Sequence, residues 1–265
     1  MTAMTAQAPP SEDAGLQITD LTIAFGGNTA VDGVSLTAPR HRITGLIGPN
    51  GAGKTTTFNA CSGLLRPGRG SVHLFGRDVT ARGPASRARL GLGRTFQRME
   101  LFDSLTVERN VALGLEARLA GSHPLKQLLS PRPDRTAVRA ATEESLELCG
   151  LGGRRHDPAG ALPTGQRRLV DLARVLTGGF DLLLLDEPSS GLDTSETRRF
   201  GAIVANVVAE RGCGVLLVEH DMSLVMSICE HLYVLDFGRL VFEGSPEGVR
   251  GSEAVRAAYL GSEAA

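Results

Sequence analysis

The chain has 265 residues, and it contains no tryptophan, two tyrosines and four cysteines. It also lacks an apolar run close to the roughly 20 residues that a bilayer-spanning helix needs. The first fifteen residues are polar and rich in Ala, Thr and Pro, so the pattern of a secretory signal is missing. The formal net charge of -1 argues against a nucleic-acid scaffold, which would usually be basic. We therefore expect a cytosolic protein that does not bind nucleic acid.

The four cysteines, Cys61, Cys149, Cys213 and Cys229, are widely spaced and form no CxxC pair. This spacing favours reduced thiols over a metal or redox site. A hydrophobic content of 42% is ample for a buried core. The length predicts one domain, or one domain with an additional lobe, and residues 1–14 are expected to be disordered.

Alternating strand-like and helix-like patterns predict an α/β fold with a parallel sheet and no internal repeats. The strand-like runs are Leu16–Phe25, Val34–Ala38, Arg42–Ile47, Ser71–Phe75, Leu182–Asp186, Val215–Glu219, Leu232–Leu235 and Leu240–Phe242. The helix-like runs in the first 150 residues are Gly53–Ser62, Val107–Leu119 and Thr136–Cys149. We expect a single domain over residues 15–262, with a helical subdomain at about 98–165 that carries a Pro-rich insertion around Ser122–Arg135.

The segment from Gly48 to Thr55 reads GPNGAGKT and matches the phosphate-loop pattern G-x-x-x-x-G-K-[ST]. It follows a predicted strand and opens a predicted helix, which is the context that the motif requires. Its glycines allow backbone N–H groups to turn towards the β- and γ-phosphates of a nucleotide, and the helix N-terminus adds positive charge. The alternative is a chance Gly-rich turn between a strand and a helix. The expected nucleotide contacts are Gly48, Pro49, Asn50, Gly51, Ala52, Gly53, Lys54, Thr55 and Thr56.

Lys54 and Lys126 are the only lysines among the 28 basic residues. A compact ammonium suits the phosphate loop better than a planar guanidinium, so we assign Lys54 to the terminal phosphates of ATP. Thr55 is expected to offer its hydroxyl to Mg²⁺. We expect this loop to be exposed to solvent, so that Lys54→Ala would not unfold the chain.

Asp186 ends a continuous apolar run, and Glu187 follows it directly. A buried parallel strand would place Asp186 at the edge of the sheet beside the phosphate loop, where it could hold the water shell of Mg²⁺. Glu187 could then orient or deprotonate the attacking water. The alternative is a pair of acids that caps the end of a strand.

His220 ends another apolar run, VLLVEH. A lone histidine is more often structural, but together with the phosphate loop and the acidic pair it is expected to contact the γ-phosphate. Gln97, at the start of the helical lobe, could contact Mg²⁺ or the attacking water. The sequence Asp236-Phe237-Gly238 spells a magnesium triplet of kinases, but it stands between two short β-runs without a kinase catalytic loop before it. It is therefore expected to be a hairpin turn.

From Leu16 to Gly261 these motifs resemble the ATP-binding subunits of ABC transporters. In that family GPNGAGKT is Walker A, Gln97 marks the Q-loop, LLLLDEP is Walker B and His220 is the switch histidine. The resemblance implies a P-loop NTPase core with a parallel sheet, an N-terminal antiparallel β subdomain and an inserted helical subdomain. It also implies that Phe25 stacks on adenine, and it adds residues of the signature LPTGQ and of the D-loop SGLD to the nucleotide site: Thr164, Gly165, Gln166 and Asp193.

The resemblance implies a head-to-tail dimer with two ATP molecules, in which Walker A of one chain faces the signature of the other. The expected partners are a second ATPase subunit, identical or different, two polytopic permease subunits and, indirectly, an extracytoplasmic substrate-binding protein. The chain would then lie in the cytoplasm on the inner face of the cell membrane. The expected cofactors are ATP and Mg²⁺.

Four features resemble the importers of branched-chain or other hydrophobic amino acids: FGGNTAVDGVSL, GRTFQRMELFDSLTVERN, the Pro-rich insertion and VRAAYLG. Urea and amide importers share this layout, so the sequence is also compatible with the ATPase of such an importer. It leaves open three further functions: the ATPase of a lipid or lipopolysaccharide exporter, a soluble ABC ATPase without a permease, and a module that binds ATP without turnover.

The signature departs from the family pattern at Pro163, where the family usually has serine or another small polar residue. Proline supplies neither a hydroxyl nor a backbone N–H to the phosphate of the partner. The hydroxyl of Thr164 is the candidate substitute.

Overall fold

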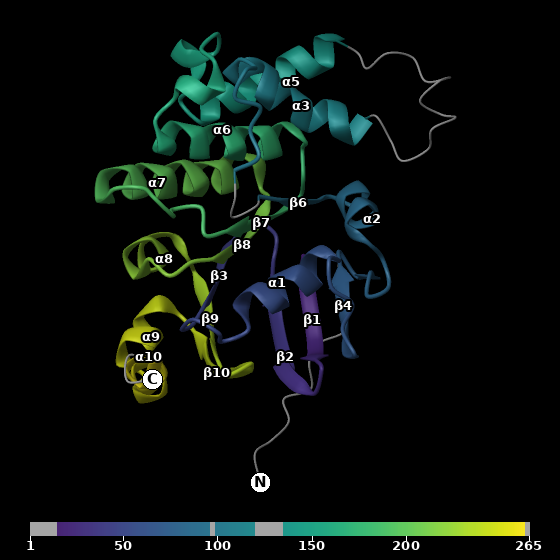
Figure 1. The fold of residues 1–265 in the computed structure, drawn as a ribbon, viewed down its shortest axis with the longest axis vertical. Helices are drawn as coiled ribbons and strands as arrows, with labels where there is room; N and C mark the ends of the chain where they lie inside the picture. Colours follow the sequence, from purple (N-terminus) through teal and green to yellow (C-terminus); the bar gives the residue numbers. More distant parts are fainter. Residues whose placement is uncertain (1–14, 96–98, 120–134, 263–265) are drawn as a thin grey trace.

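The computed structural model describes residues 15–95, 99–119 and 135–262, with side chains described up to residue 259. The predictions for residues 1–14, for Gln97 and for nearly all of the Pro-rich insertion lie outside these residues. Two sheets and a helical lobe make up the described chain (Figure 1). The α/β class, the antiparallel N-terminal sheet and the inserted helices predicted from the sequence are confirmed.

The N-terminal sheet is antiparallel and has the strand order β2-β1-β4-β5. Its bounds are β1 Leu16–Phe25, β2 Asn28–Ala38, β4 Arg69–Leu74 and β5 Arg77–Asp78. The predicted strand Leu16–Phe25 agrees with β1, whereas the predicted strand Val34–Ala38 is only the second half of β2. The missed half begins directly after the turn at Gly26 and Gly27, both of which have positive φ. Glycine adopts this conformation without steric cost, which allows the tight return of the chain.

The second sheet has the strand order β10-β9-β3-β8-β7-β6. Neighbours from β9 to β6 are parallel, and only the edge strand β10 is antiparallel to its neighbour. The bounds are β3 Ile43–Ile47, β6 Leu92–Arg94, β7 Leu182–Asp186, β8 Gly214–Val218, β9 His231–Asp236 and β10 Arg239–Gly244. The turn between β9 and β10 contains Phe237 and Gly238, both with positive φ, so the predicted hairpin is confirmed.

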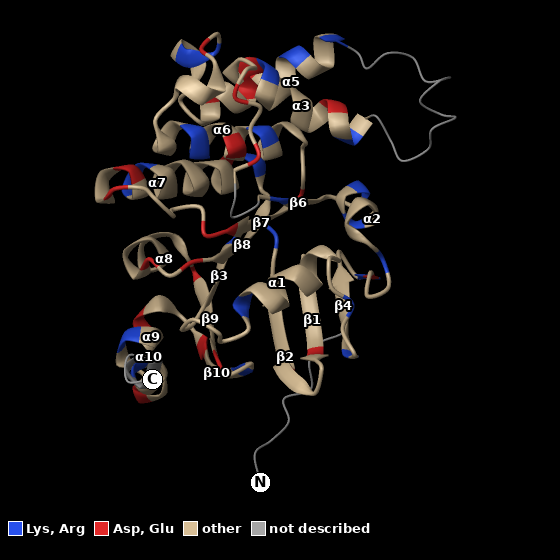
Figure 2. Cartoon of the chain, viewed as in Figure 1, with Lys and Arg blue, Asp and Glu red and all other residues tan. Residues whose placement is uncertain are grey.

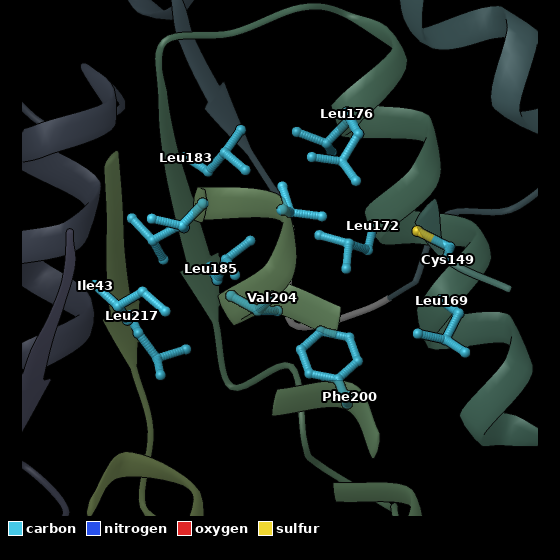
Figure 3. Close-up of a cluster of buried hydrophobic side chains, with 14 of the residues drawn as sticks. Ile43, Cys149, Leu169, Leu172, Leu176, Leu183, Leu185, Phe200, Val204 and Leu217 are labelled. Carbon is cyan, nitrogen blue, oxygen red and sulfur yellow. The ribbon is translucent and has the colours of Figure 1, made fainter. Parts of the chain in front are cut away.

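Apolar side chains on both faces of this sheet explain why its strands appear as continuous hydrophobic runs. In β7, Leu183 and Leu185 pack with the helices on one face, as Figure 3 shows. Leu182 and Leu184 point to the other face, where they join the core shared with the N-terminal sheet. The sheet therefore lies between two cores, and its strand positions are fixed by packing from both sides.

Helix α1 (Lys54–Ser62) packs against β1, β2 and β8 and so lies between the two sheets. The short helix α2 (Pro84–Arg89) supplies Arg87, which is 1% exposed. The guanidinium of Arg87 donates to the carbonyl oxygens of Ala60 (2.6 Å) and Cys61 (2.7 Å) in the last turn of α1. A cation at a helix C-terminus is favourable, so Arg87 fixes the end of α1 opposite the phosphate loop.

The helical lobe contains α3 (Val107–Leu119) and α5 (Arg135–Leu148), which pack against each other and against α6 (Thr164–Thr177). Figure 1 shows this lobe at the top of the molecule, above the parallel sheet. Two 3₁₀ turns, η2 (Gly152–Arg154) and η3 (Ala159–Ala161), lead from α5 to α6. The other helices among the described residues are α7 (Thr194–Arg211), α8 (Met222–Ile228), α9 (Pro246–Gly251) and α10 (Glu253–Ser262).

Basic and acidic residues are interspersed along α5, α6 and α7 (Figure 2), in keeping with the small net charge. Among the described residues no helix has both the length and the apolar character needed to span a bilayer. All four cysteines are buried and form no disulfide bond; reduced thiols were predicted from their spacing, but their burial was not. Burial raises the pKa of the Cys61, Cys149 and Cys229 thiols to about 12, so these groups remain protonated near neutral pH.

Candidate functional site

The predicted motifs follow the ends of four adjacent strands. The sheet places β3, β8, β7 and β6 side by side and parallel, so their C-terminal ends meet at one edge. The phosphate loop follows β3, the segment with His220 follows β8, and Asp186 with Glu187 ends β7. The Gln97 segment follows β6 but lies outside the described residues. Ligands of open α/β sheets bind at this edge.

The phosphate loop passes directly into the N-terminus of α1. Its Gly53 is the N-cap in a left-handed conformation (φ 97°), and no side chain caps the helix. The first N–H groups of a helix point outward without an intrahelical partner, which makes this terminus a site for an anion. A Cβ at Gly48 would lie 2.1 Å from the carbonyl oxygen of Leu235, and one at Gly53 would lie 2.6 Å from that of Ala30. Close backbone packing alone therefore requires these two glycines.

Lys54 is 7% exposed, so the prediction that it stands in a solvated loop is wrong. Its ammonium group donates to the carbonyl oxygens of Gly48 (2.6 Å) and Pro49 (2.8 Å). Burial lowers the pKa of Lys54, and the nearby negative charge of Glu187 opposes this shift. Lys54 therefore links the two ends of the loop, because it stands at the start of α1 and binds the carbonyls where β3 ends.

Asp186 is 5% exposed and forms an ion pair with Arg94 of β6, with 3.1 Å between Nη2 and Oδ2. Burial raises the pKa of Asp186, and the positive charge of Arg94 opposes this shift. Arg94 also donates to the side chains of Asn59 (2.9 Å) and Ser62 (2.6 Å) in α1. The guanidinium thus connects the Walker B carboxyl group to the helix that follows the phosphate loop.

Glu187 has a left-handed backbone (φ 46°), which costs a residue other than glycine on the order of 1–3 kcal/mol. Its N–H donates to the carbonyl oxygen of Val218 (2.9 Å), which continues the β7–β8 ladder past Asp186. Such backbone conformations persist only where surrounding contacts impose them, and they are common at active sites. Here the conformation turns the chain sharply after the strand, and the charge of Glu187 acts on Lys54.

His220 follows β8 with a side chain that is 60% exposed, whereas the neighbouring Glu219 is fully buried. An exposed imidazole at the ligand edge agrees better with a contact to a ligand than with a core role. Phe25 is 50% exposed at the end of β1, which leaves its ring free to contact a ligand. Stacking of Phe25 on adenine stays a prediction.

The signature residues form the first turn of α6 and lie far in sequence from the phosphate loop. Thr164 is exposed, Gly165 is buried and Gln166 is half-buried. A Cβ at Gly165 would lie 2.4 Å from Oε1 of Glu196, the third residue of α7. Glycine is therefore needed here for close packing of the signature against α7 of the same chain, while Thr164 faces solvent.

Asp193 of the D-loop is the N-cap of α7. Its carboxyl group accepts from the N–H groups of Ser195 (2.7 Å) and Glu196 (2.8 Å), and Glu196 accepts from the N–H of Asp193 in return. These hydrogen bonds form a capping box and lower the pKa of Asp193. The predicted nucleotide contact of Asp193 stays a prediction, since its carboxyl group already serves the helix of its own chain.

Three residues of this region were not predicted from the sequence: Arg94, Arg168 and Glu219. Each is charged and nearly buried, with partners distant in sequence. For Glu219 the sequence did contain a signal, because an acidic residue stands in the apolar run VLLVEH. A charged residue is rarely buried without a partner, so an acid at this position indicates specific contacts. Nothing in the sequence distinguished Arg94 and Arg168 from the many other arginines of the chain.

Two families match the sequence. The family described as ABC transporter matches residues 31–190. The chain belongs to this family. The family described as Branched-chain amino acid ATP-binding cassette transporter matches residues 239–265. The resemblance drawn from the phosphate loop, the signature and the acidic pair is thereby confirmed.

Relatives match nearly the whole chain. The high-affinity branched-chain amino acid transport ATP-binding protein BraF of Pseudomonas aeruginosa is 37% identical over 249 residues, which are 93% of this chain and 97% of the relative. LivG of Escherichia coli (strain K12), described in the same words, is 36% identical over 250 residues, or 93% and 97% of the two chains. The lipopolysaccharide export system ATP-binding protein LptB of Haemophilus influenzae is 33% identical over 244 residues, or 92% and 96%.

Solved structures agree with these relatives. The ADP conformation of an ATP-binding cassette of an ABC transporter superimposes with a TM-score of 0.82 at 30% identity, covering 93% of this chain and 98% of that one. A nucleotide-free cassette superimposes with a TM-score of 0.80 at 29% identity, covering 92% and 98%. The protein is therefore a nucleotide-binding ABC-type ATPase whose ATP hydrolysis is coupled to transport.

The unusual signature leads to a testable expectation. Pro163 is the N-cap of α6 and carries no capping side chain, whereas serine is a favoured N-cap. Pro163→Ser adds a hydroxyl and an N–H where the phosphate of a partner chain is expected. A hydrogen bond to a charged group is worth about 1.5–3 kcal/mol, so we expect tighter ATP-dependent dimerisation and several-fold faster hydrolysis.

The measurement compares the hydrolysis rate and ATP-dependent dimerisation of Pro163→Ser and Thr164→Ala side by side. Because serine can also cap α6 itself, thermal unfolding of both variants separates helix stability from the phosphate contact. If Pro163→Ser changes neither rate nor dimerisation while Thr164→Ala abolishes both, the hydroxyl of Thr164 already completes the site.

Proposed function

We propose that this chain is the ATP-hydrolysing subunit of an importer of branched-chain or other hydrophobic amino acids. The observation that supports this substrate class most strongly is the C-terminal match, residues 239–265, to the branched-chain amino acid cassette family. The descriptions of the relatives from Pseudomonas aeruginosa and Escherichia coli point the same way. Features of the sequence outside the ATP site, such as VRAAYLG, supported the same branch.

The chemistry of the site follows from its charges and its backbone geometry. The loop from Gly48 to Thr56 would hold the triphosphate of ATP with N–H groups at the start of α1, and Lys54 would turn from the loop carbonyls to the phosphates. Glu187 would take a proton from water as the water oxygen attacks the γ-phosphorus. The bond to the β–γ bridging oxygen then breaks, and ADP leaves with that electron pair. His220 would donate a hydrogen bond to the γ-phosphate.

The residues near the phosphate loop suit Mg²⁺ by their chemistry. Thr55 is an exposed residue in the first turn of α1, and Asp186 ends β7, two strands away from β3 in the sheet. Hydroxyl and carboxylate oxygens are the ligands that Mg²⁺ prefers, usually together with water and phosphate oxygens. Mg²⁺ would neutralise charge on the phosphates, and Gln97 is the third proposed ligand. Arg94 would release Asp186 or share it with the metal.

We infer that two ATPase subunits pair head to tail, identical or different. The exposed position of Thr164 at the start of α6 supports this arrangement, because the signature then faces outward for a second chain. The partners proposed for the dimer are two polytopic permeases, with a substrate-binding protein acting on the far side of the membrane. The chain would lie on the inner, cytoplasmic face of the membrane.

A second function is supported by one observation, the 33% identity to a lipopolysaccharide export ATPase. That relative covers nearly the same length as the amino acid transport relatives, at a slightly lower identity. The ATP site would be the same in both cases, since the two functions differ in the permease and in the direction of transport. The import function is preferred because of the C-terminal family match.

The experiment is uptake into vesicles that contain the full chain, the permeases that co-purify with it and their binding protein. Labelled leucine, urea and a lipopolysaccharide precursor are offered separately, with ATP on the side of the ATPase. We expect ATP-dependent leucine accumulation that disappears when the chain carries Glu187→Gln. Uptake of urea alone, or movement of the lipid alone, would replace the proposed substrate class while leaving the ATPase assignment in place.

A further inference from the structure

A buried acid lies directly before His220. Glu219 directly follows the apolar strand β8, and its side chain is 0% exposed. One carboxyl oxygen, Oε1, accepts from the N–H of Ser189 at 2.8 Å. The other, Oε2, accepts from the N–H of His220 at 3.1 Å and lies 3.9 Å from the imidazole Nδ1 of the same residue. Glu219 therefore contacts the segment after β7 with one oxygen and the segment with His220 with the other.

These contacts extend the pairing of β7 and β8 beyond the strands. The regular ladder ends where Asp186 pairs with Val218. Glu187 then donates to the carbonyl oxygen of Val218, and Ser189 donates to the side chain of Glu219. After the strained turn at Glu187, the acceptor is thus the carboxyl group of Glu219 and no longer a backbone carbonyl oxygen of β8. The turn is held at both ends by residues of the segment that leads to His220.

The signature helix α6 contacts the same segment. Arg168 of α6 is 8% exposed, and its guanidinium Nη2 donates to the carbonyl oxygen of Ser190 at 3.2 Å. Burial lowers the pKa of Arg168, while the negative charges of Asp171, Glu219 and Glu187 oppose the shift. Glu219 therefore binds the backbone of Ser189, and Arg168 binds the backbone of the next residue, Ser190, where the D-loop begins.

We propose that Glu219 is a positioning residue for ATP hydrolysis that holds the turn of Glu187 and the backbone of His220 in one fixed arrangement. Together with Arg168 it connects the signature helix α6, the D-loop and the switch histidine within one chain. Glu219 need not touch the nucleotide, since its side chain is fully buried. Its effect on the reaction passes through Glu187 and His220.

A carboxyl group suits this position because both of its oxygens accept hydrogen bonds from backbone N–H donors. Glutamine keeps one acceptor oxygen but places an NH₂ group against N–H donors on one side. Alanine removes both acceptors, which leaves the buried N–H of Ser189 without this partner. Glutamine therefore removes one of the two hydrogen bonds that connect the segments, and alanine removes both.

The test uses the full chain with ATP and magnesium, and it rests on the proposed roles of Glu187 and His220. We expect Glu219→Ala to lower kcat on the order of tenfold or more, because one buried and one part-buried hydrogen bond are lost, while KM for ATP stays within about twofold. Glu219→Gln should lie between Glu219→Ala and the natural chain. Glu230→Gln is the matched control, because this acid is 55% exposed and pairs only loosely with Arg42 at 3.6 Å.

A double-variant cycle separates positioning from general stability. Because Glu219 is proposed to act partly through His220, Glu219→Ala should slow hydrolysis by a smaller factor in a chain that already carries His220→Ala than in the natural chain. Losses that multiply would overturn the proposal, as would a kcat for Glu219→Ala equal to that of Glu230→Gln. Should Glu219→Ala not fold, the cycle is run with Glu219→Gln, and the same two results decide.

Hydrogen exchange supplies a readout independent of turnover. We expect the backbone amides of Ser189 and His220 to exchange faster in Glu219→Ala, on the order of tenfold, while amides in the middle of β8 keep their protection. Unchanged exchange at Ser189 contradicts the proposal even if activity falls. A natural chain without ATPase activity would instead contradict the proposed function, so the two failures can be told apart.

Discussion

Replacing Glu187 with glutamine is expected to reduce ATP hydrolysis on the order of 10²-fold or more, as for the loss of a general base. The amide keeps the shape of the side chain but cannot accept the proton of the attacking water. The backbone of Glu187, with its positive φ and its hydrogen bond to Val218, does not depend on the carboxyl group and should be retained. ATP should therefore still bind, and the ATP-bound dimer should accumulate. Phosphate release and size-exclusion chromatography with ATP measure the two effects.

The control for this substitution is Glu210→Gln, which makes the same chemical change in an exposed acid near the end of α7. It should hydrolyse ATP like the natural chain. Hydrolysis by Glu187→Gln at the same rate as this control would remove Glu187 from the chemical step. A loss of ATP binding together with turnover would point to damage of the site instead.

Replacing Lys54 with alanine is expected to lower ATP affinity on the order of 10- to 100-fold, the equivalent of one hydrogen bond to a charged group. The change removes the ammonium group expected at the terminal phosphates. It also leaves the carbonyl oxygens of Gly48 and Pro49 without their present donor. Some loss of thermal stability should therefore accompany the loss of affinity. Titration of ATP by calorimetry and a thermal unfolding curve measure both.

Lys54→Arg separates charge from geometry. It keeps the positive charge but replaces a compact ammonium by a planar guanidinium that must fit a site only 7% exposed. We expect its ATP affinity to be reduced as well. If Lys54→Ala binds ATP as tightly as the natural chain at a temperature where both are folded, the phosphate-loop assignment is wrong.

Most of the longer strands and the motifs at their ends could be predicted because each carries a local signal, whereas the short strands β5 and β6 and the first half of β2 were missed. The run Leu182–Asp186 is apolar up to its last residue, since both faces of β7 are covered, and the structure ends the strand at the predicted residue. The phosphate loop was recognisable from its glycines and its single lysine. The prediction that Asp186 lies beside this loop needed only the rule that ligands bind where parallel strands end, whereas His220 was assigned from its occurrence together with the other motifs.

Contacts between distant side chains could not be predicted in this way. The burial of Lys54 depends on the carbonyl oxygens at the end of β3, and no pattern in the sequence states where a flexible side chain turns. The ion pair of Arg94 with Asp186 joins residues 92 positions apart. The position of Glu219 between two segments depends on the turn at Glu187, which in turn depends on the packing of β7 against β8.

We propose that the ends of four neighbouring strands form one site that hydrolyses ATP with magnesium. This is tested by the release of phosphate and ADP by the full chain, measured over time with and without Mg²⁺, for the natural sequence, Lys54→Ala and Glu187→Gln in parallel. We expect equal amounts of phosphate and ADP from the natural chain, a requirement for Mg²⁺, and rates near background in both variants. Equal hydrolysis by all three proteins would contradict the proposed site.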